Sequence, residues 1–114
     1  MSLIYEKSKL FAISIVQLCQ FLRNEKGEYV LSKQLLQSGT SIGANLAEAK
    51  YAISRNDFIA KQYIALKETS ETIYWLELLH QTDYLTEVQF RTSYQKAEEL
   101  RKLLSASTKS LQES

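Results

Sequence analysis

Proline, the commonest helix breaker, is absent from the 114 residues of this chain, which include only three glycines. Long helices can therefore form along the whole chain. A chain of this length can bury one hydrophobic core but not two. We therefore expect residues 1–114 to fold as a single all-α domain.

Four segments have the spacing of amphipathic helices, with apolar residues recurring every three or four positions. They cover residues 3–24, 31–51, 55–82 and 87–112. The third segment has the broadest apolar face, made of Phe58, Ile59, Ala65, Leu66, Ile73, Leu76 and Leu79, with Tyr63, Tyr74 and Trp75 beside it. Because the connections are only about two to six residues long, consecutive helices should be antiparallel neighbours. The sequence predicts an antiparallel up-down-up-down four-helix bundle.

Turn and capping residues support these boundaries. Gly27 follows the first segment and can adopt the positive φ that ends many helices. Ser54 is a suitable N-cap for the third segment, and Asp57 suits its first turn. Thr86 and Gln89 have the spacing of a capping box, which marks the start of the fourth segment.

Two of the three glycines fall inside the second segment, where they lower the stability of the helix. Gly39, Gly43 and Ala47 recur at steps of four and form a strip almost without side chains. Each glycine within a helix costs about 1 kcal/mol relative to alanine. Close approach of another backbone would offset that cost, so we interpret the strip as a helix-packing seam. In an oligomer, the same strip is a candidate contact between subunits.

The chain offers little material for catalytic or metal chemistry. Glu77 and His80 form one Glu-x-x-His pair, whereas a di-iron bundle needs two such pairs and two further glutamates. Cys19 lies within the apolar pattern of the first segment, which favours a small buried hydrophobe over a nucleophile. No phosphate-binding loop or dinucleotide fingerprint is present. We predict no enzyme, catalytic residue, metal or cofactor, and no small-molecule substrate.

Seven polar residues lie beside the apolar stripes of the second and third segments. They are Ser41, Asn45, Glu48, Lys67, Glu68, Glu71 and Thr72. If the two segments bring them together, Lys67 could pair with Glu48 or with Glu71, four residues on. Such a network would fix helix register or a subunit contact, because buried polar groups need partners. The alternatives are a ligand or partner site, or an enzymatic site shared between subunits.

The turn between the second and third segments is locally basic. Between residues 49 and 67, Lys50, Arg55, Lys61 and Lys67 stand against Asp57 alone, although the formal net charge of the whole chain is only +1. On a monomer these cations would form an ordinary solvated surface. Repeated around an oligomer, they would form a basic ring, with Lys50, Arg55 and Lys61 as candidate phosphate contacts to RNA or DNA.

The sequence also indicates the cellular compartment of the protein. No apolar run approaches the ~18 residues that a membrane span requires, and the chain is already charged at Glu6, unlike a secretion signal. A single cysteine allows no disulfide within the chain. We expect a cytoplasmic protein with no membrane partner.

The stretch from residue 41 to residue 76 resembles a known family. Ser-Ile-Gly-Ala-Asn-Leu-Ala-Glu-Ala at residues 41–49 is similar to the Ser-Ile-x-x-Asn-x-x-Glu-Ala/Gly signature of the small four-helix proteins encoded in bacterial 23S ribosomal RNA intervening sequences. Residues 54–61, 65–68 and 71–76 resemble the third helix of that family. The signature positions are Ser41, Asn45, Glu48, Asp57, Lys61, Lys67, Glu68, Glu71 and Trp75.

This resemblance implies a left-handed up-down bundle and, as in several members of the family, a ring of five subunits. It implies no established enzymatic activity, and the signature residues have no known catalytic role. Relatives include the accessory protein of diversity-generating retroelements, a basic barrel that binds nucleic acid and a reverse transcriptase. We therefore expect a homopentameric scaffold or interaction protein, with a nucleic-acid-binding accessory protein as the alternative.

Overall fold

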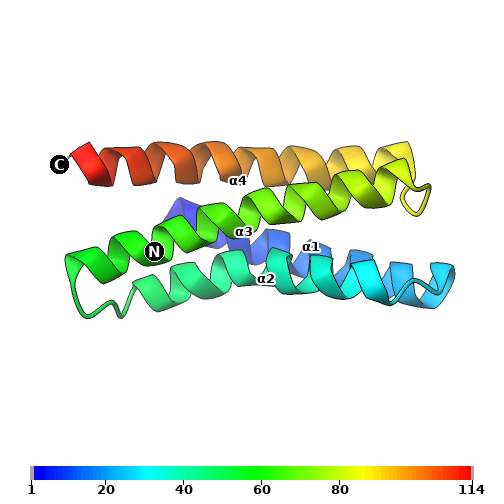
Figure 1. The fold of residues 1–114 in the computed structure, drawn as a ribbon, viewed down its shortest axis with the longest axis horizontal. Helices are drawn as coiled ribbons and strands as arrows, with labels where there is room; N and C mark the ends of the chain where they lie inside the picture. The colour runs from blue at the N-terminus through cyan, green and yellow to red at the C-terminus, as the bar shows by residue number, and fades with distance from the viewer. Residues whose placement is uncertain (1, 114) are drawn as a thin grey trace.

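The computed structural model describes residues 2–113 and contains four helices. The helices are α1 (Leu3–Lys26), α2 (Val30–Ala49), α3 (Arg55–Gln81) and α4 (Glu87–Glu113). Successive helices run in opposite directions, so both chain ends lie at the same end of the molecule (Figure 1), which measures about 46 by 21 by 21 Å. The all-α prediction is confirmed, and each predicted segment begins and ends within two residues of the observed helix. The handedness of the bundle stays a prediction.

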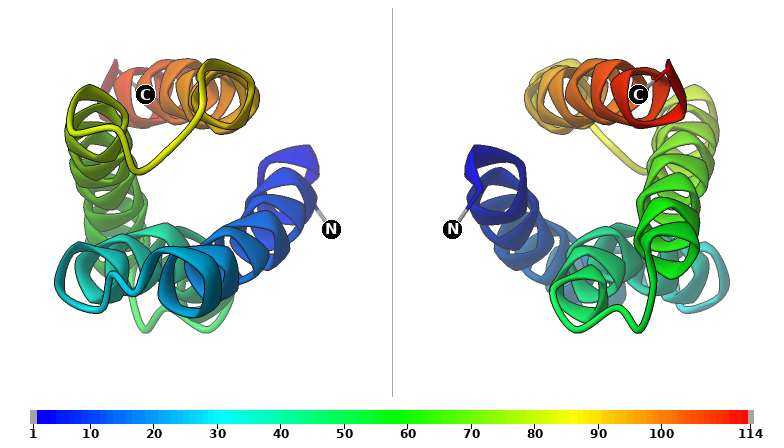
Figure 2. Two further views of the ribbon diagram at one scale, coloured as in Figure 1. Left: turned by 90° about the vertical axis from the view of Figure 1, so that its right-hand side faces the viewer. Right: turned by 90° about the vertical axis from the view of Figure 1, so that its left-hand side faces the viewer.

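One hydrophobic core joins all four helices. It consists of Phe11, Ile15, Cys19, Leu22, Leu35, Ile42, Leu46, Ala65, Leu76, Leu79, Leu85, Ala97, Leu100 and Leu104. Both end-on views show the helices in the order α1, α2, α3, α4 around the long axis, with α1 and α3 at opposite corners (Figure 2). The contact between α1 and α4 closes the circle and is the smallest of the four.

The core-facing side of α3 differs from the apolar face that the sequence predicted. The buried positions of α3 are Ala65, Thr69, Thr72, Leu76 and Leu79, so two threonines sit inside the bundle. Each threonine hydroxyl donates 2.8 Å to the carbonyl four residues earlier in α3, and a hydroxyl satisfied in this way can be buried at little cost. Ile59, Leu66 and Ile73, which the pattern assigned to the core face, are only partly buried.

The predicted helix boundaries have the predicted capping groups. Ser54 Oγ accepts a hydrogen bond of 3.0 Å from the Asp57 amide. Thr86 and Gln89 each accept from the backbone amide of the other, at 3.1 and 2.9 Å, as a capping box requires. Gly27 has a φ of 62° and ends α1. The capping prediction is therefore confirmed at three helix ends.

The cap of α2 was not predicted, and it is formed by Glu28. One carboxylate oxygen accepts from the amides of Val30 and Leu31 at 3.2 and 3.0 Å, and the other accepts from Ser32 at 2.7 Å. A carboxylate is well placed there, since it satisfies orphan amides and opposes the positive end of the helix dipole. The interaction fixes the tight connection between α1 and α2.

Candidate functional site

The glycine strip of α2 packs inside the bundle, against α1. A Cβ atom added to Gly39 would lie 2.8 Å from Ile15 Cγ2, and one added to Gly43 would lie 3.1 Å from Ser8 Oγ. Both glycines are buried, whereas Ala47 is partly exposed. The contacts of Gly39 and Gly43 are those of a helix-packing seam inside the bundle. They leave no room there for a second subunit, because α1 of the same chain packs against both glycines.

The polar cluster predicted from α2 and α3 is mostly a set of separate surface contacts. Glu48 forms an ion pair of 3.1 Å with Lys61, not with Lys67. Ser41 and Asn45 bond within α2, where Ser41 donates to the Gln37 carbonyl and the Asn45 amide donates to the Ser41 carbonyl. Lys67 is exposed and makes no ion pair with any residue in the described range.

Only Thr72 of this cluster enters the core. Its hydroxyl lies 2.9 Å from Ser38 Oγ of α2, and this contact links the two helices. Glu71 Oε1 accepts from the Trp75 indole at 3.4 Å along the surface of α3. Partial burial, together with the neighbouring Glu71 carboxylate, raises the pKa of Glu68. The contacts of this cluster that join α2 to α3 are Thr72 with Ser38 in the core and Glu48 with Lys61 at the surface.

Two of the three candidate phosphate contacts already have partners on the protein. Lys61 pairs with Glu48, and the Arg55 guanidinium donates 2.6 Å to the Leu111 carbonyl near the end of α4. Lys50 is exposed at the end of α2, and it forms no ion pair within the described part of the chain. Glu48 offsets the charge of Lys61, whereas the bond to a neutral carbonyl orients Arg55 without reducing its charge.

The one cysteine and the one histidine lie in different surroundings. The Cys19 thiol is in the core and donates to the Ser32 carbonyl at 3.4 Å. His80 Nε2 lies 2.9 Å from Glu87 Oε2, and the imidazole stacks on Phe90 with 4.1 Å between ring centroids. Within residues 2–113, no three His, Cys, Asp or Glu side chains are grouped closely enough to hold a metal ion.

Cys19 should contribute to the loss of stability at alkaline pH. Burial raises the pKa of its thiol from 9.0 to about 11, so the unfolded chain loses the proton at a lower pH than the folded protein. This contribution is complete below the unfolded pKa and is lost as the pH rises toward the folded one. Between about pH 8 and about pH 10, urea unfolding of the native protein should lose about 1 kcal/mol more than that of Cys19→Ala. Equal losses in both proteins would refute this role.

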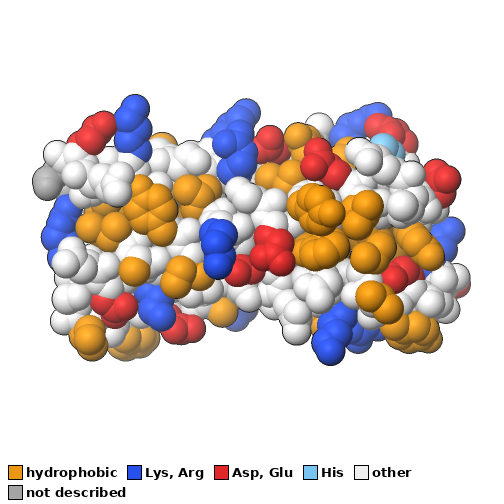
Figure 3. Space-filling view, viewed as in Figure 1, with side chains coloured by type: hydrophobic (Ala, Val, Ile, Leu, Met, Phe, Trp, Pro, Cys, Tyr) orange, Lys and Arg blue, Asp and Glu red, His pale blue; other side chains and the backbone are white. Residues whose placement is uncertain are grey.

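The outer side of α3 is unusually apolar for a surface helix. Its exposed or partly buried apolar residues are Ile59, Tyr63, Ile64, Leu66, Ile73, Tyr74, Trp75 and Leu78; we call them the outer face of α3. Three of them, Leu66, Ile73 and Trp75, also touch the core at the edges of the helix. Tyr63 is 37% exposed and Tyr74 is 56% exposed. Hydrophobic side chains gather in two groups on the side of the molecule where α3 lies, with charged side chains between them (Figure 3). The helix also carries charged residues, among them Lys67 and Glu71, but its apolar side chains extend well beyond the side that faces the core.

A second apolar surface follows α1 at the opposite corner of the bundle. Its exposed members are Leu3, Leu10, Ile13 and Val16, which we call the outer stripe of α1. Leu3 and Leu10 are 61% and 67% exposed. This stripe was not predicted, because each helix was assigned a single apolar face. The signal was nevertheless present, since Leu3, Leu10 and Ile13 recur at helical spacing beside the core positions.

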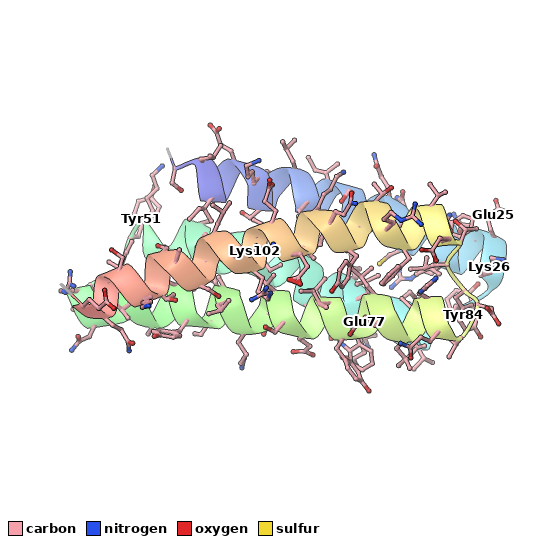
Figure 4. The ribbon with its side chains drawn as sticks, turned by 90° about the horizontal axis from the view of Figure 1, so that it is seen from above. Glu25, Lys26, Tyr51, Glu77, Tyr84 and Lys102 are labelled. Atoms are coloured by element: carbon pink, nitrogen blue, oxygen red, sulfur yellow. The ribbon has the colours of Figure 1, made fainter. Side chains whose placement is uncertain are left out.

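A cleft of about 540 Å³ lies at the end of the bundle that contains both chain ends. Each helix lines it, with Ile4 from α1, Leu46 from α2, Phe58 from α3 and Ser107 from α4 among the lining residues. Tyr51, another lining residue, is labelled at this end in Figure 4. The cleft combines side chains that are distant in sequence, which explains why no local motif indicated it.

Known proteins share this sequence pattern and this fold. The sequence matches the family model described as 23S rRNA-intervening sequence protein over residues 2–106. The fold is similar to the crystal structure of a protein with unknown function from the S23 ribosomal protein family of Bacteroides thetaiotaomicron, with 52% sequence identity and a TM-score of 0.92. That similarity covers 94% of this chain and 99% of the other. No curated protein is similar enough to this chain to be recognised as a relative.

Proposed function

This chain belongs to the 23S rRNA-intervening sequence protein family, as its signature predicted, and we propose that it acts as a self-associating interaction protein. In this proposal the chain catalyses no reaction, and its assembly is a scaffold for partner molecules. Membership of this family does not assign an activity to the chain, since the similar protein of known structure is itself described as having unknown function. The observation that carries the proposal is the apolar outer face of α3.

The outer face of α3 has the composition of a contact surface. Five of its eight apolar side chains, Ile59, Tyr63, Ile64, Tyr74 and Leu78, have no part in the core or in the layer packed against it. Three of the eight are tyrosine or tryptophan, which are enriched where proteins meet. Tyr74 and Trp75 also contact each other edge to face, with 4.9 Å between ring centroids. Covering apolar area contributes roughly 25 cal/mol per Å².

The positions of the two apolar surfaces favour a closed ring. A cyclic assembly with more than two subunits needs two different patches on each chain, since each subunit contacts the next head to tail. The helices that carry the two surfaces, α3 and α1, lie at opposite corners of the bundle (Figure 2), and the side chains of both surfaces are exposed or partly buried. We therefore propose that α3 of one subunit packs on α1 of the next. Five subunits is the number that the family resemblance implies, and the protein would then be a homopentamer.

The native mass of the purified protein tests this proposal. One chain has a mass of 13.1 kDa, so a ring of five would measure about 65 kDa in light scattering. We expect that mass at micromolar concentration, with an ultraviolet absorbance ratio typical of protein alone. A protein that stays monomeric at this concentration would contradict the proposal.

Nucleic-acid binding is the alternative function, and it has less support. Lys61 and Arg55 are already engaged with Glu48 and the Leu111 carbonyl, so a phosphate would compete with contacts inside the protein. None of the helices, over the residues described, is both long and apolar enough to cross a membrane. An assembly that purifies with bound nucleic acid would favour nucleic-acid binding over the scaffold function.

A further inference from the structure

We propose that the cleft at the end of the bundle binds a small amphipathic anion. The apolar body of the ligand would occupy the cleft, a hydrogen-bond donor would face Gln62, and the anionic group would pair with Lys50. The proposal concerns the bundle end, whereas self-association was assigned to the sides of α1 and α3. The two ideas can therefore fail independently.

The lining of the cleft fits an apolar body. Ile4, Tyr5, Leu46 and Phe58 contribute aliphatic and aromatic surface from three helices. The volume of about 540 Å³ lies within the range of roughly 300–1,000 Å³ that is typical of small-molecule sites. Such sites are mostly apolar and carry a few polar groups that fix the orientation of the ligand.

Gln62 supplies the first of these polar groups. It lies on α3 and lines the cleft, and its side-chain Oε1 is buried without a hydrogen-bond partner among the described residues. A buried amide oxygen left in this state lowers stability, because it has lost water and gained no donor. A ligand with an N–H or O–H group at this position would satisfy it. The unsatisfied amide oxygen belongs to a residue that lines the cleft, and a change of the Gln62 rotamer would turn it toward a ligand bound there.

Lys50 supplies the charge. It lines the same cleft from the end of α2, it is exposed, and its ammonium has no ion pair with any residue from 2 to 113. The two acidic residues nearest to it in sequence have other contacts, since Glu48 pairs with Lys61 and Asp57 accepts from the Ile53 amide. An anionic group on the ligand would therefore meet a cation that no carboxylate of residues 2–113 holds in an ion pair.

A matched pair of fluorescent probes can test both polar contacts. Anilinonaphthalenesulfonate has an aromatic body, an N–H donor and an anionic group, whereas phenylnaphthylamine has the same body and donor without the charge. Both dyes also bind exposed apolar surface, so specificity must come from the difference between them. For the native protein we expect one site per chain and about fivefold tighter binding of the sulfonate, the most that a partly exposed ion pair supplies.

Substitutions at Lys50 and Gln62 test the two polar contacts separately. Lys50→Ala should remove the preference for the sulfonate, while Lys33→Ala, which removes an exposed lysine from the other half of α2, should keep it. Gln62→Leu should weaken both dyes about three- to tenfold, the effect of one hydrogen bond. The same change should raise the Tm of the ligand-free protein by about 3 °C, because it removes a buried unsatisfied group. A glutamine with a purely structural role would not combine a higher Tm with weaker binding.

Three results would overturn the proposal. Equal affinity for the two dyes, or equal effects of Lys50→Ala and Lys33→Ala, would mean that Lys50 does not pair with the ligand. Loss of dye binding in a variant altered only on the outer face of α3 would place the dye there. Dye binding that appears only when the assembly is dissociated would mean that a second copy of the chain covers the cleft.

Discussion

Gly39→Leu is expected to lower the free energy of unfolding by about 3 kcal/mol or more. Even the first carbon of the new side chain would lie 2.8 Å from Ile15 Cγ2, closer than two carbon atoms can pack. Ile15 is completely buried in the core, so it cannot turn away, and α1 and α2 must separate. Leucine is a better helix former than glycine by up to about 1 kcal/mol. The loss from the steric clash is expected to exceed this gain.

The control for this prediction is Ala44→Leu. Ala44 lies further along the same helix and is exposed, so the new side chain meets water and should change stability by less than about 0.5 kcal/mol. Urea unfolding followed by circular dichroism would compare both variants with the native protein. Gly43→Leu should also disturb the bundle, because its Cβ would lie 3.1 Å from Ser8 Oγ. If Gly39→Leu is as stable as Ala44→Leu, the strip is not a packing seam.

The sequence was sufficient to predict the helices because their signals are local. No proline interrupts the periodic segments, and Ser54 and the Thr86–Gln89 pair cap their helices through contacts only three residues apart. Gly39 and Gly43 could also be interpreted as a seam, since a glycine inside a helix needs a reason. What the strip packs against could not be predicted, because that depends on which helix lies beside it.

The core of α3 was harder to predict because its polarity pattern is misleading. Thr69 and Thr72 are buried, while Ile73 and Tyr74 lie further out. A threonine hydroxyl that donates to a carbonyl of its own helix is already hydrogen-bonded, so the side chain can be buried without a partner from another helix. Periodicity assigns the most apolar side to the core, and it fails when a helix has two covered sides. The mismatch on α3 is therefore itself a reason to propose that protein covers its outer face.

The candidate site was only partly predictable, for a related reason. Glu48 pairs with Lys61 instead of Lys67, because the pairing depends on how α2 and α3 are rotated against each other. The cleft likewise depends on the relative positions of four helix ends, and Gln62 has no sequence context that distinguishes it from a surface glutamine. Contacts between helices follow from rigid-body geometry, which one amphipathic stripe per helix does not specify.

The double variant Tyr63→Glu with Tyr74→Lys is expected to convert the assembly to a monomer of about 13 kDa. Both tyrosines lie on the outer face of α3. The free energy needed to remove two charges from water in an apolar interface exceeds the free energy that the contact between subunits supplies. The monomer itself should stay folded. A glutamate at position 63 would lie four residues before Lys67, and a lysine at position 74 would lie three residues from both Glu71 and Glu77, so each new charge has an opposite charge within reach on α3.

The control places the same two charges on exposed apolar residues elsewhere. Ile53 in the connection between α2 and α3 is 94% exposed, and Val88 in the first turn of α4 is 70% exposed, so Ile53→Glu with Val88→Lys keeps the net charge of the test variant. Light scattering should then give about 65 kDa for the control and the single-chain mass for the test variant, with equal circular dichroism spectra. If both variants keep the native mass, subunits do not meet through α3. If both dissociate, the effect is not specific to that helix, and the outer face would remain an apolar surface without the role assigned to it.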